Sequence, residues 1–132
     1  MNTTRSIFEA LTVRQLFLLD GLGAVVTAVM LGAVLPAFEP AFGMPRPILL
    51  ALALVAASFA AYSLTCHVRA ASARMLLGIT VANTAYCVCT LGLVVWLRGS
   101  LTWLGVAYFL GEILVIAALV TVELIVARRA RD

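Results

Sequence analysis

The chain has 132 residues, of which 64% are hydrophobic and only 11% are charged, and its formal net charge is +3 at pH 7. Because a soluble domain carries about 25% charged residues, this composition excludes an ordinary soluble protein. It predicts an integral membrane protein with a single domain, residues 1–132. All of the basic residues are arginine. Without lysine, the chain has no side-chain amine for a Schiff-base cofactor such as retinal or pyridoxal phosphate.

Residues that bind metals or haem are few. The chain contains one histidine, His67, and three cysteines. Cys87 and Cys89 are two positions apart and point to nearly opposite sides of a helix, so they form neither a CxxC redox pair nor a metal clamp. One histidine does not supply bis-histidine haem ligation. We therefore expect no metal and no cofactor, and we interpret the cysteines as small apolar residues.

The N-terminal part of the chain predicts an interfacial segment, a first helix and a loop. Residues 1–15 combine apolar and arginine side chains and are expected to lie on the membrane surface. Thr12 and Gln15 form a capping-box pattern, and the first helix is predicted over residues 16–35. All four prolines fall in residues 36–47, which favours a loop because proline interrupts a helix.

Three further apolar runs predict helices over residues 48–66, 75–97 and 101–127. Each is close to the roughly 20 residues that cross about 30 Å of hydrocarbon. The short turn at 98–100 makes the last two helices antiparallel neighbours. Small residues at four-residue spacing predict close packing of the first two helices, through Ala24, Ala28 and Gly32 on one and Ala53, Ala57 and Ala61 on the other. The predicted fold class is an all-α, polytopic integral membrane four-helix bundle.

Arginine placement predicts the orientation of the bundle. With four spans, both termini share one side, which then carries most of the arginines, whereas only Arg46 and Arg98 lie on the other. The positive-inside rule places the arginine-rich side, with the N and C termini, in the cytoplasm. We therefore expect a multi-pass protein of a bacterial inner membrane. The positive charge indicates membrane orientation and predicts no nucleic-acid partner.

Two carboxyl groups inside the predicted spans are candidate catalytic residues. Glu112 lies near the middle of residues 101–127, where an ionised group costs about 2.5–3.5 kcal/mol on insertion scales. Asp20 lies about one turn inside the first helix. A protonated Glu112 can act as a general acid with Asp20 as the base. The competing interpretation of Asp20 is an ion pair with Arg14.

Five other polar side chains are candidate ligand-binding residues, because all four helices place such groups at a similar height in the inner half of the bilayer. They are Tyr62, Asn83, Tyr86, Tyr108 and Glu123. Asn83 belongs to a polar stripe at three- and four-residue steps, which also contains Thr80, Cys87 and Thr90. Glu123 is expected nearer the cytoplasmic interface, where pairing with an arginine is the alternative.

Three functions follow from this pattern. The first is a pocket for a lipophilic or cationic small molecule, with or without acid–base catalysis of the isomerase or cyclase kind. The second is proton-coupled transport by a homodimer, for which a buried carboxyl group is a suitable basis. The third is a structural role, in which the polar groups form a hydrogen-bond network that holds the helices together. The lipid bilayer is the partner common to all three, and no motif identifies a known family.

Overall fold

The computed structural model describes residues 12–69 and 72–131, and every element in this part of the chain is helical. Four long helical segments are long and apolar enough to cross a membrane, which confirms the predicted all-α bundle. The elements in chain order are α2 (Val13–Val29), the π-helical turn η1 (Met30–Val34), α3 (Leu35–Ala37), α4 (Glu39–Phe42), α5 (Arg46–Arg69), α6 (Ala73–Trp96) and α7 (Trp103–Arg131).

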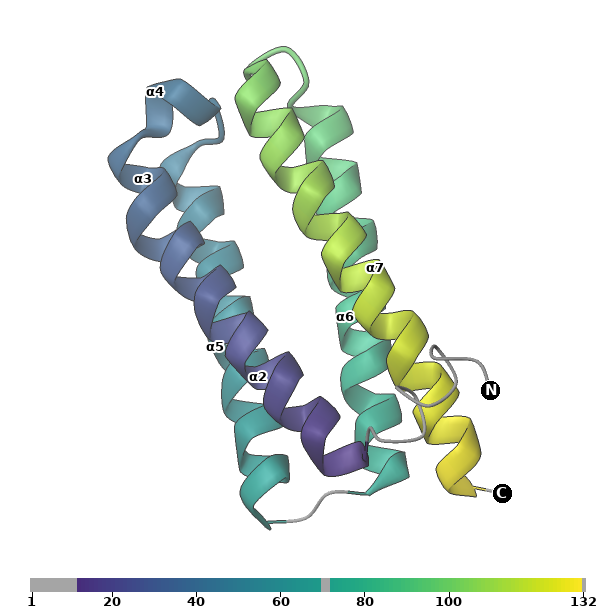
Figure 1. Cartoon of the computed structure of the whole chain (residues 1–132). Coiled ribbons are helices and arrows are strands. Elements are labelled where there is room, and N and C mark those ends of the chain that lie inside the picture. Colours follow the sequence, from purple (N-terminus) through teal and green to yellow (C-terminus); the bar gives the residue numbers. More distant parts are fainter. Residues whose placement is uncertain (1–11, 70–71, 132) are drawn as a thin grey trace, which may run out of the picture.

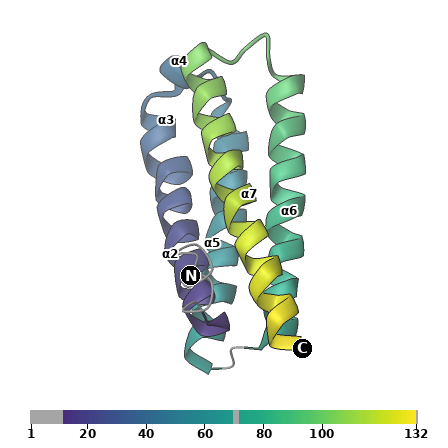
Figure 2. The same ribbon diagram turned by 45° about the vertical axis from the view of Figure 1, so that its right-hand side comes forward.

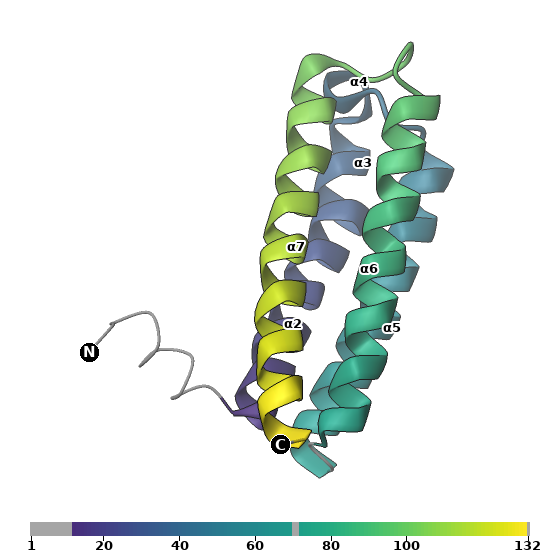
Figure 3. The same ribbon diagram turned by 90° about the vertical axis from the view of Figure 1, so that its right-hand side faces the viewer.

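The long helices run alternately up and down (Figure 1). The start of α2, the end of α5, the start of α6 and the end of α7 lie at one end of the bundle. α4 and the turn between α6 and α7 lie at the other (Figures 1 and 2). Figure 3, a view from the side, shows α6 and α7 in front of α2 and α5. We call the two ends the arginine-rich end and the proline-rich end.

The helix boundaries differ from the predicted ones by one to four residues. The capping box at Thr12 is present, since the Thr12 hydroxyl accepts a hydrogen bond from the Gln15 N–H, and the helix begins at Val13. The predicted loop 36–47 contains the short helix α4, which ends at Gly43. Gly43 has a φ of +82°, a left-handed conformation that glycine adopts without steric cost. Of the predicted interfacial segment, residues 1–11 lie outside the described residues.

The first long segment passes through a π-helical turn just before its proline. Pro36 has no N–H, and its ring would clash with the carbonyl four residues earlier, that of Gly32 in a regular helix. Gly32 lies inside η1, where the wider turn separates that carbonyl from the ring. The segment therefore continues to Ala37 as a helix, two residues further than predicted.

Two helical hairpins make up the bundle, because the most extensive interfaces join α2 to α5 and α6 to α7. α2 and α5 approach closely at Gly21, where an added Cβ would lie 2.6 Å from Leu64 Cδ2, and at Gly32, where it would lie 3.3 Å from Ala53 Cβ. The contact of Gly32 with Ala53 confirms part of the predicted pair of small-residue ridges. Ala57 and Ala61, however, are exposed, and the buried alanines of α5 are Ala56 and Ala60.

The hairpins are joined at the proline-rich end by the residue that caps α7. The Thr102 hydroxyl donates to Ala41 O at 2.6 Å, and the Thr102 N–H donates to Phe42 O at 3.2 Å. The same hydroxyl accepts from the Gly105 N–H in the first turn of α7. Nearer the arginine-rich end, the Tyr62 hydroxyl of α5 donates to Met75 O of α6 at 2.8 Å. The contacts between the hairpins are otherwise sparse.

Large aliphatic side chains cover the outside of the bundle. On each long helix at least one such side chain is more than 60% exposed, namely Val26, Leu54, Val81, Val88, Leu114 and Val115. Soluble monomers seldom expose a continuous apolar surface of this kind. It is the surface that a lipid environment requires.

Candidate functional site

A buried aspartate connects three helices near the arginine-rich end. Asp20 of α2 is only 3% exposed. Its Oδ2 accepts a hydrogen bond from the Ser63 hydroxyl of α5 at 2.6 Å, and its Oδ1 accepts one from the Asn83 amide of α6 at 2.7 Å. Both donors are neutral, so the Asp20 carboxylate is solvated by dipoles and not paired with a cation. Each oxygen keeps a second lone pair for another partner.

The fourth helix adds a second carboxyl group at the same level. Glu123 of α7 is fully buried, and its Oε2 accepts a hydrogen bond from the Thr80 hydroxyl at 2.8 Å. Its carboxyl group lies beside Asp20 and Asn83. The other oxygen, Oε1, is buried and has no hydrogen-bond partner. We call Asp20, Ser63, Thr80, Asn83 and Glu123 the inner polar cluster.

The members of the inner polar cluster lie at one height in the bundle, because each is a similar number of residues from the arginine-rich end of its helix. α2 begins at Val13 and α6 at Ala73, whereas α5 ends at Arg69 and α7 at Arg131. Asp20, Thr80, Ser63 and Glu123 therefore lie about six to eight residues from the arginine-rich ends of their helices, or roughly 9–12 Å along the axis. All four helices thus meet in polar contact at one height.

A second polar group lies further toward the proline-rich end, between α6 and α7. The buried Tyr86 hydroxyl donates a 2.5 Å hydrogen bond to Glu112 Oε1. Glu112 Oε2 and the Thr90 hydroxyl oxygen are both buried without partners. Aromatic rings surround this pair, with Phe59 edge-on to Tyr86 at a centroid distance of 6.1 Å and Tyr108 edge-on to Phe42 at 6.0 Å. We call Tyr86, Thr90 and Glu112 the outer polar cluster.

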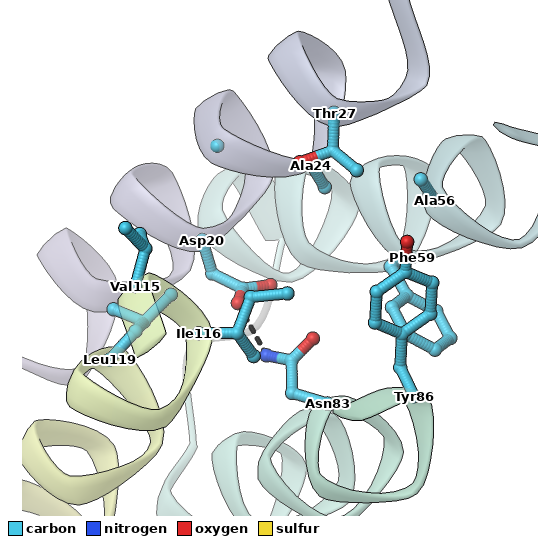
Figure 4. A pocket seen from close by; sticks show the side chains of 11 residues that line it. Asp20, Ala24, Thr27, Ala56, Phe59, Asn83, Tyr86, Val115, Ile116 and Leu119 are labelled. Atoms are coloured by element: carbon cyan, nitrogen blue, oxygen red, sulfur yellow. Dashed lines mark hydrogen bonds between the residues drawn. The ribbon is translucent and has the colours of Figure 1, made fainter. Parts of the chain in front are cut away.

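A cavity lies between the two hairpins and touches both clusters. It contains about 480 Å³ of empty space, including a part open to the surroundings, and all four long helices line it. In Figure 4, Asp20 and Asn83 line one side, joined by their hydrogen bond, and the Asn83 amide oxygen is directed away from Asp20. The remaining walls are mainly apolar or aromatic, with Ala24, Thr27, Ala56, Phe59, Tyr86, Val115, Ile116 and Leu119.

The cavity is partly open to the outside of the bundle. Val115 of α7 lines the cavity and is also 70% exposed on the outside of the bundle. Gly23 of α2 lines it as well, and nothing lies within 4 Å of the position of its absent Cβ. A second, apolar groove of about 450 Å³ runs between α5 and α6 past Tyr62 and Gly78.

The predicted site residues fall into three places. Asp20, Asn83 and Glu123 come together in the inner polar cluster, and Asp20 and Asn83 line the cavity. Tyr86, Glu112 and Tyr108 gather further along, where only Tyr86 lines the cavity. Tyr62 stands apart, because it is 40% exposed and turns to the α5–α6 groove.

The expected alternative partners of the acidic residues are not the ones observed. Arg14 does not pair with Asp20, since its Nε donates to His67 O at 3.0 Å, while His67 Nδ1 lies 2.8 Å from Arg14 O. Glu123 lies level with Asp20 and bonds to Thr80, so the expectation of an interfacial glutamate paired with arginine is wrong.

Two residues of the inner polar cluster were not among the predicted site residues. Thr80 lies one turn before Asn83 in the polar stripe of α6, so the stripe itself was the signal that could have identified it. Ser63 follows Tyr62 directly, and nothing in an all-apolar helix indicates which of two adjacent polar residues faces inward.

No group of three or more His, Cys, Asp or Glu side chains in the described residues is arranged to hold a metal ion. No family model, curated protein or solved structure matches the chain.

Proposed function

We propose that the protein is a multi-pass membrane protein that binds a lipophilic cation in the cavity between its two hairpins. The observation that carries the proposal is Asp20, a carboxylate on the wall of a largely apolar cavity. Its hydrogen-bond partners are neutral. Such a group keeps its charge available for a cationic ligand, whereas a carboxylate already paired with arginine does not.

The rest of the cavity suits the apolar part of such a ligand. Its empty space of about 480 Å³, part of which is open to the surroundings, is bordered mainly by apolar side chains. Phe59 and Tyr86 offer aromatic rings, and ring faces attract ammonium and phosphonium groups. The Asn83 amide oxygen supplies an acceptor for a ligand N–H.

Binding is better supported than acid–base catalysis. A general acid and a general base must both come within hydrogen-bond reach of the substrate. Asp20 lines the cavity, but Glu112 does not, and its Oε1 is occupied by the Tyr86 hydroxyl. A substrate at Asp20 would therefore meet Tyr86 before Glu112.

The proposed orientation places the arginine-rich end in the cytoplasm of a bacterial cell. Arg14, Arg69, Arg74, Arg128 and Arg129 belong to that end, and Arg46 and Arg98 to the proline-rich end. The positive-inside rule favours this orientation in the inner membrane. The cavity opening then faces the bilayer, and the inner polar cluster lies in the cytoplasmic half.

Ligand binding can be measured by calorimetric titration of the detergent-solubilised protein with benzyltrimethylammonium. Its neutral isostere neopentylbenzene, in which carbon replaces the charged nitrogen, serves as the matched ligand. We expect the cation to bind and the isostere to bind at least about tenfold more weakly, which corresponds to about 1.4 kcal/mol. Equal affinity for the two molecules would contradict a charge-selective site.

The matched protein variants are Asp20→Asn and Glu39→Gln. Asp20→Asn removes the charge from the cavity and should weaken cation binding at least about tenfold. Glu39 lies in α4 at the proline-rich end, where it accepts from the Arg46 N–H, and Glu39→Gln should leave binding unchanged. If Asp20→Asn does not fold, Gly23→Leu narrows the cavity from a position with free space and should also reduce binding. Unchanged affinity in a folded Asp20→Asn protein would refute the proposed function.

A further inference from the structure

Two carboxyl groups meet inside the bundle, and no cationic side chain of the described residues pairs with them. The Glu123 carboxyl lies beside Asp20 of α2, because Thr80 and Asn83, one turn apart on α6, donate hydrogen bonds to Glu123 and to Asp20 respectively. α5 adds Ser63, which donates to Asp20. All of these neighbours apart from Asp20 are neutral. Two ionised carboxylates in contact, in a region of low dielectric constant and without a counter-ion, repel each other strongly, so such a pair retains a proton.

The hydrogen-bond pattern indicates which carboxyl oxygen carries the retained proton. Both Asp20 oxygens already accept a hydrogen bond, and Glu123 Oε2 accepts the Thr80 hydroxyl. Glu123 Oε1 is the buried oxygen of the pair that has no partner. A buried acceptor without a donor is costly, and a proton on this oxygen turns it into a donor toward the adjacent Asp20.

We propose that Asp20 and Glu123 share one proton in the ligand-free protein and release it when a cation enters the cavity. This inference rests on the proposed function, since it concerns the same ligand class. On binding, the O–H bond of the shared carboxyl group breaks, its electron pair stays on the oxygen, and the proton passes to water at the arginine-rich end, which is the nearer end of the bundle. One positive charge enters as one leaves, so the net charge of the site does not change.

The exchange follows from the position of Asp20, which belongs to both the cavity wall and the inner polar cluster. A cation at the cavity side of Asp20 supplies the counter-charge that the pair lacks. Both carboxyl groups can then be ionised, as carboxylates are beside arginine. The carboxyl pair therefore holds either the proton or the bound cation. The proton lies between Asp20 and Glu123, whereas the cation lies on the cavity side of Asp20.

Infrared spectroscopy tests the shared proton without any ligand. We expect the wild-type protein at neutral pH to show the carbonyl stretch of a protonated carboxyl group, part of which is lost in Glu123→Gln, because the variant removes the carboxyl group with the free oxygen and leaves Asp20 with its two hydrogen-bond donors. Glu39→Gln, a carboxyl change at a helix end, should not alter this absorption. If Glu123→Gln leaves the protonated-carboxyl absorption unchanged, the pair holds no proton and the inference is wrong.

Proton counting tests the exchange. Benzyltrimethylammonium is added to wild-type protein in weakly buffered solution, and a pH indicator reports the release. We expect about one proton per bound cation for the wild type and none for Glu123→Gln, which should still bind. Binding without proton release in the wild type refutes the exchange and leaves the proposed function intact. If the wild type binds no cation, the proposed function and the exchange both fail, and the infrared result decides the shared proton separately.

Discussion

Gly21 sets how closely α2 and α5 approach, and alanine at this position should destabilise the bundle. An added Cβ would lie 2.6 Å from Leu64 Cδ2, 2.7 Å from Leu64 Cγ and 3.4 Å from the Leu64 backbone nitrogen. Carbon atoms in contact prefer about 3.5–4.0 Å, so Leu64 would have to retreat by roughly 1 Å. Cγ is too near the backbone to move this far without shifting the helix.

Gly23 provides the matched control, because it lies in the same helix and nothing is within 4 Å of its Cβ position. Both substitutions raise intrinsic helix propensity by the same amount, about 1 kcal/mol. This gain cancels in a comparison of the two variants. The remaining difference is the overpacking at Leu64, which typically costs about 1–3 kcal/mol. Gly21→Ala should therefore be less stable than Gly23→Ala by this amount.

The assay is reversible unfolding in mixed micelles, with helix content followed while the denaturing detergent fraction increases. Gly21→Ala should unfold at a lower fraction than the wild type, and Gly23→Ala at an equal or higher one. Equal free energies of unfolding for the two variants would show that α2 and α5 do not approach closely at Gly21. That result would also remove the reason why Asp20, the preceding residue, lies within hydrogen-bond distance of Ser63.

The inner polar cluster and the cysteines give two further predictions. Ser63→Ala removes a 2.6 Å hydrogen bond to the buried Asp20 carboxylate and should lower the free energy of unfolding by about 1–2 kcal/mol. Ser58→Ala is the control, because this serine is exposed and bonds within its own helix, and its free energy of unfolding should stay within about 0.5 kcal/mol of the wild type. Similar losses of stability in the two variants would contradict the hydrogen bond between Ser63 and Asp20. The exposed Cys89 lies on the outer surface of a membrane-spanning helix and should react with a lipid-soluble maleimide in the folded, detergent-solubilised protein, whereas the buried Cys66 should react only after denaturation. Mass spectrometry measures the labelling. Equal labelling rates at the two cysteines would contradict the burial of Cys66.

The helices were predictable from the sequence because long apolar runs have few alternative structures in lipid. The capping pattern at Thr12 is present in the structure, but the helix was expected from residue 16 and begins three residues earlier, at Val13. The end of α7 was harder to predict from the sequence. The sequence favoured an end at Ala127, but the helix continues to Arg131, because arginines are favourable at the negative C-terminal end of a helix. The longer helix places Glu123 about 6 Å deeper than expected.

The rotation of each helix was not predictable. Soluble helices show which face is buried through their polar face, but these helices are apolar all round. α5 shows the consequence, since the sequence argument selected Tyr62 as the inward polar residue, whereas the adjacent Ser63 bonds to Asp20. The sequence therefore predicted which residue types and which helices form the candidate site. It did not predict which side chains bond to one another, because those contacts depend on how the helices pack.

The division into two hairpins has a consequence for how the protein is made. The segment up to Arg69 is synthesised before α6 and α7, and nascent chains fold from the N-terminal side. At that stage the first hairpin already has its extensive α2–α5 interface and the contact between Asp20 and Ser63, but Asn83 and Glu123 have yet to arrive. Arrival of the second hairpin completes the solvation of Asp20, so this aspartate favours correct assembly over any arrangement that leaves it facing acyl chains.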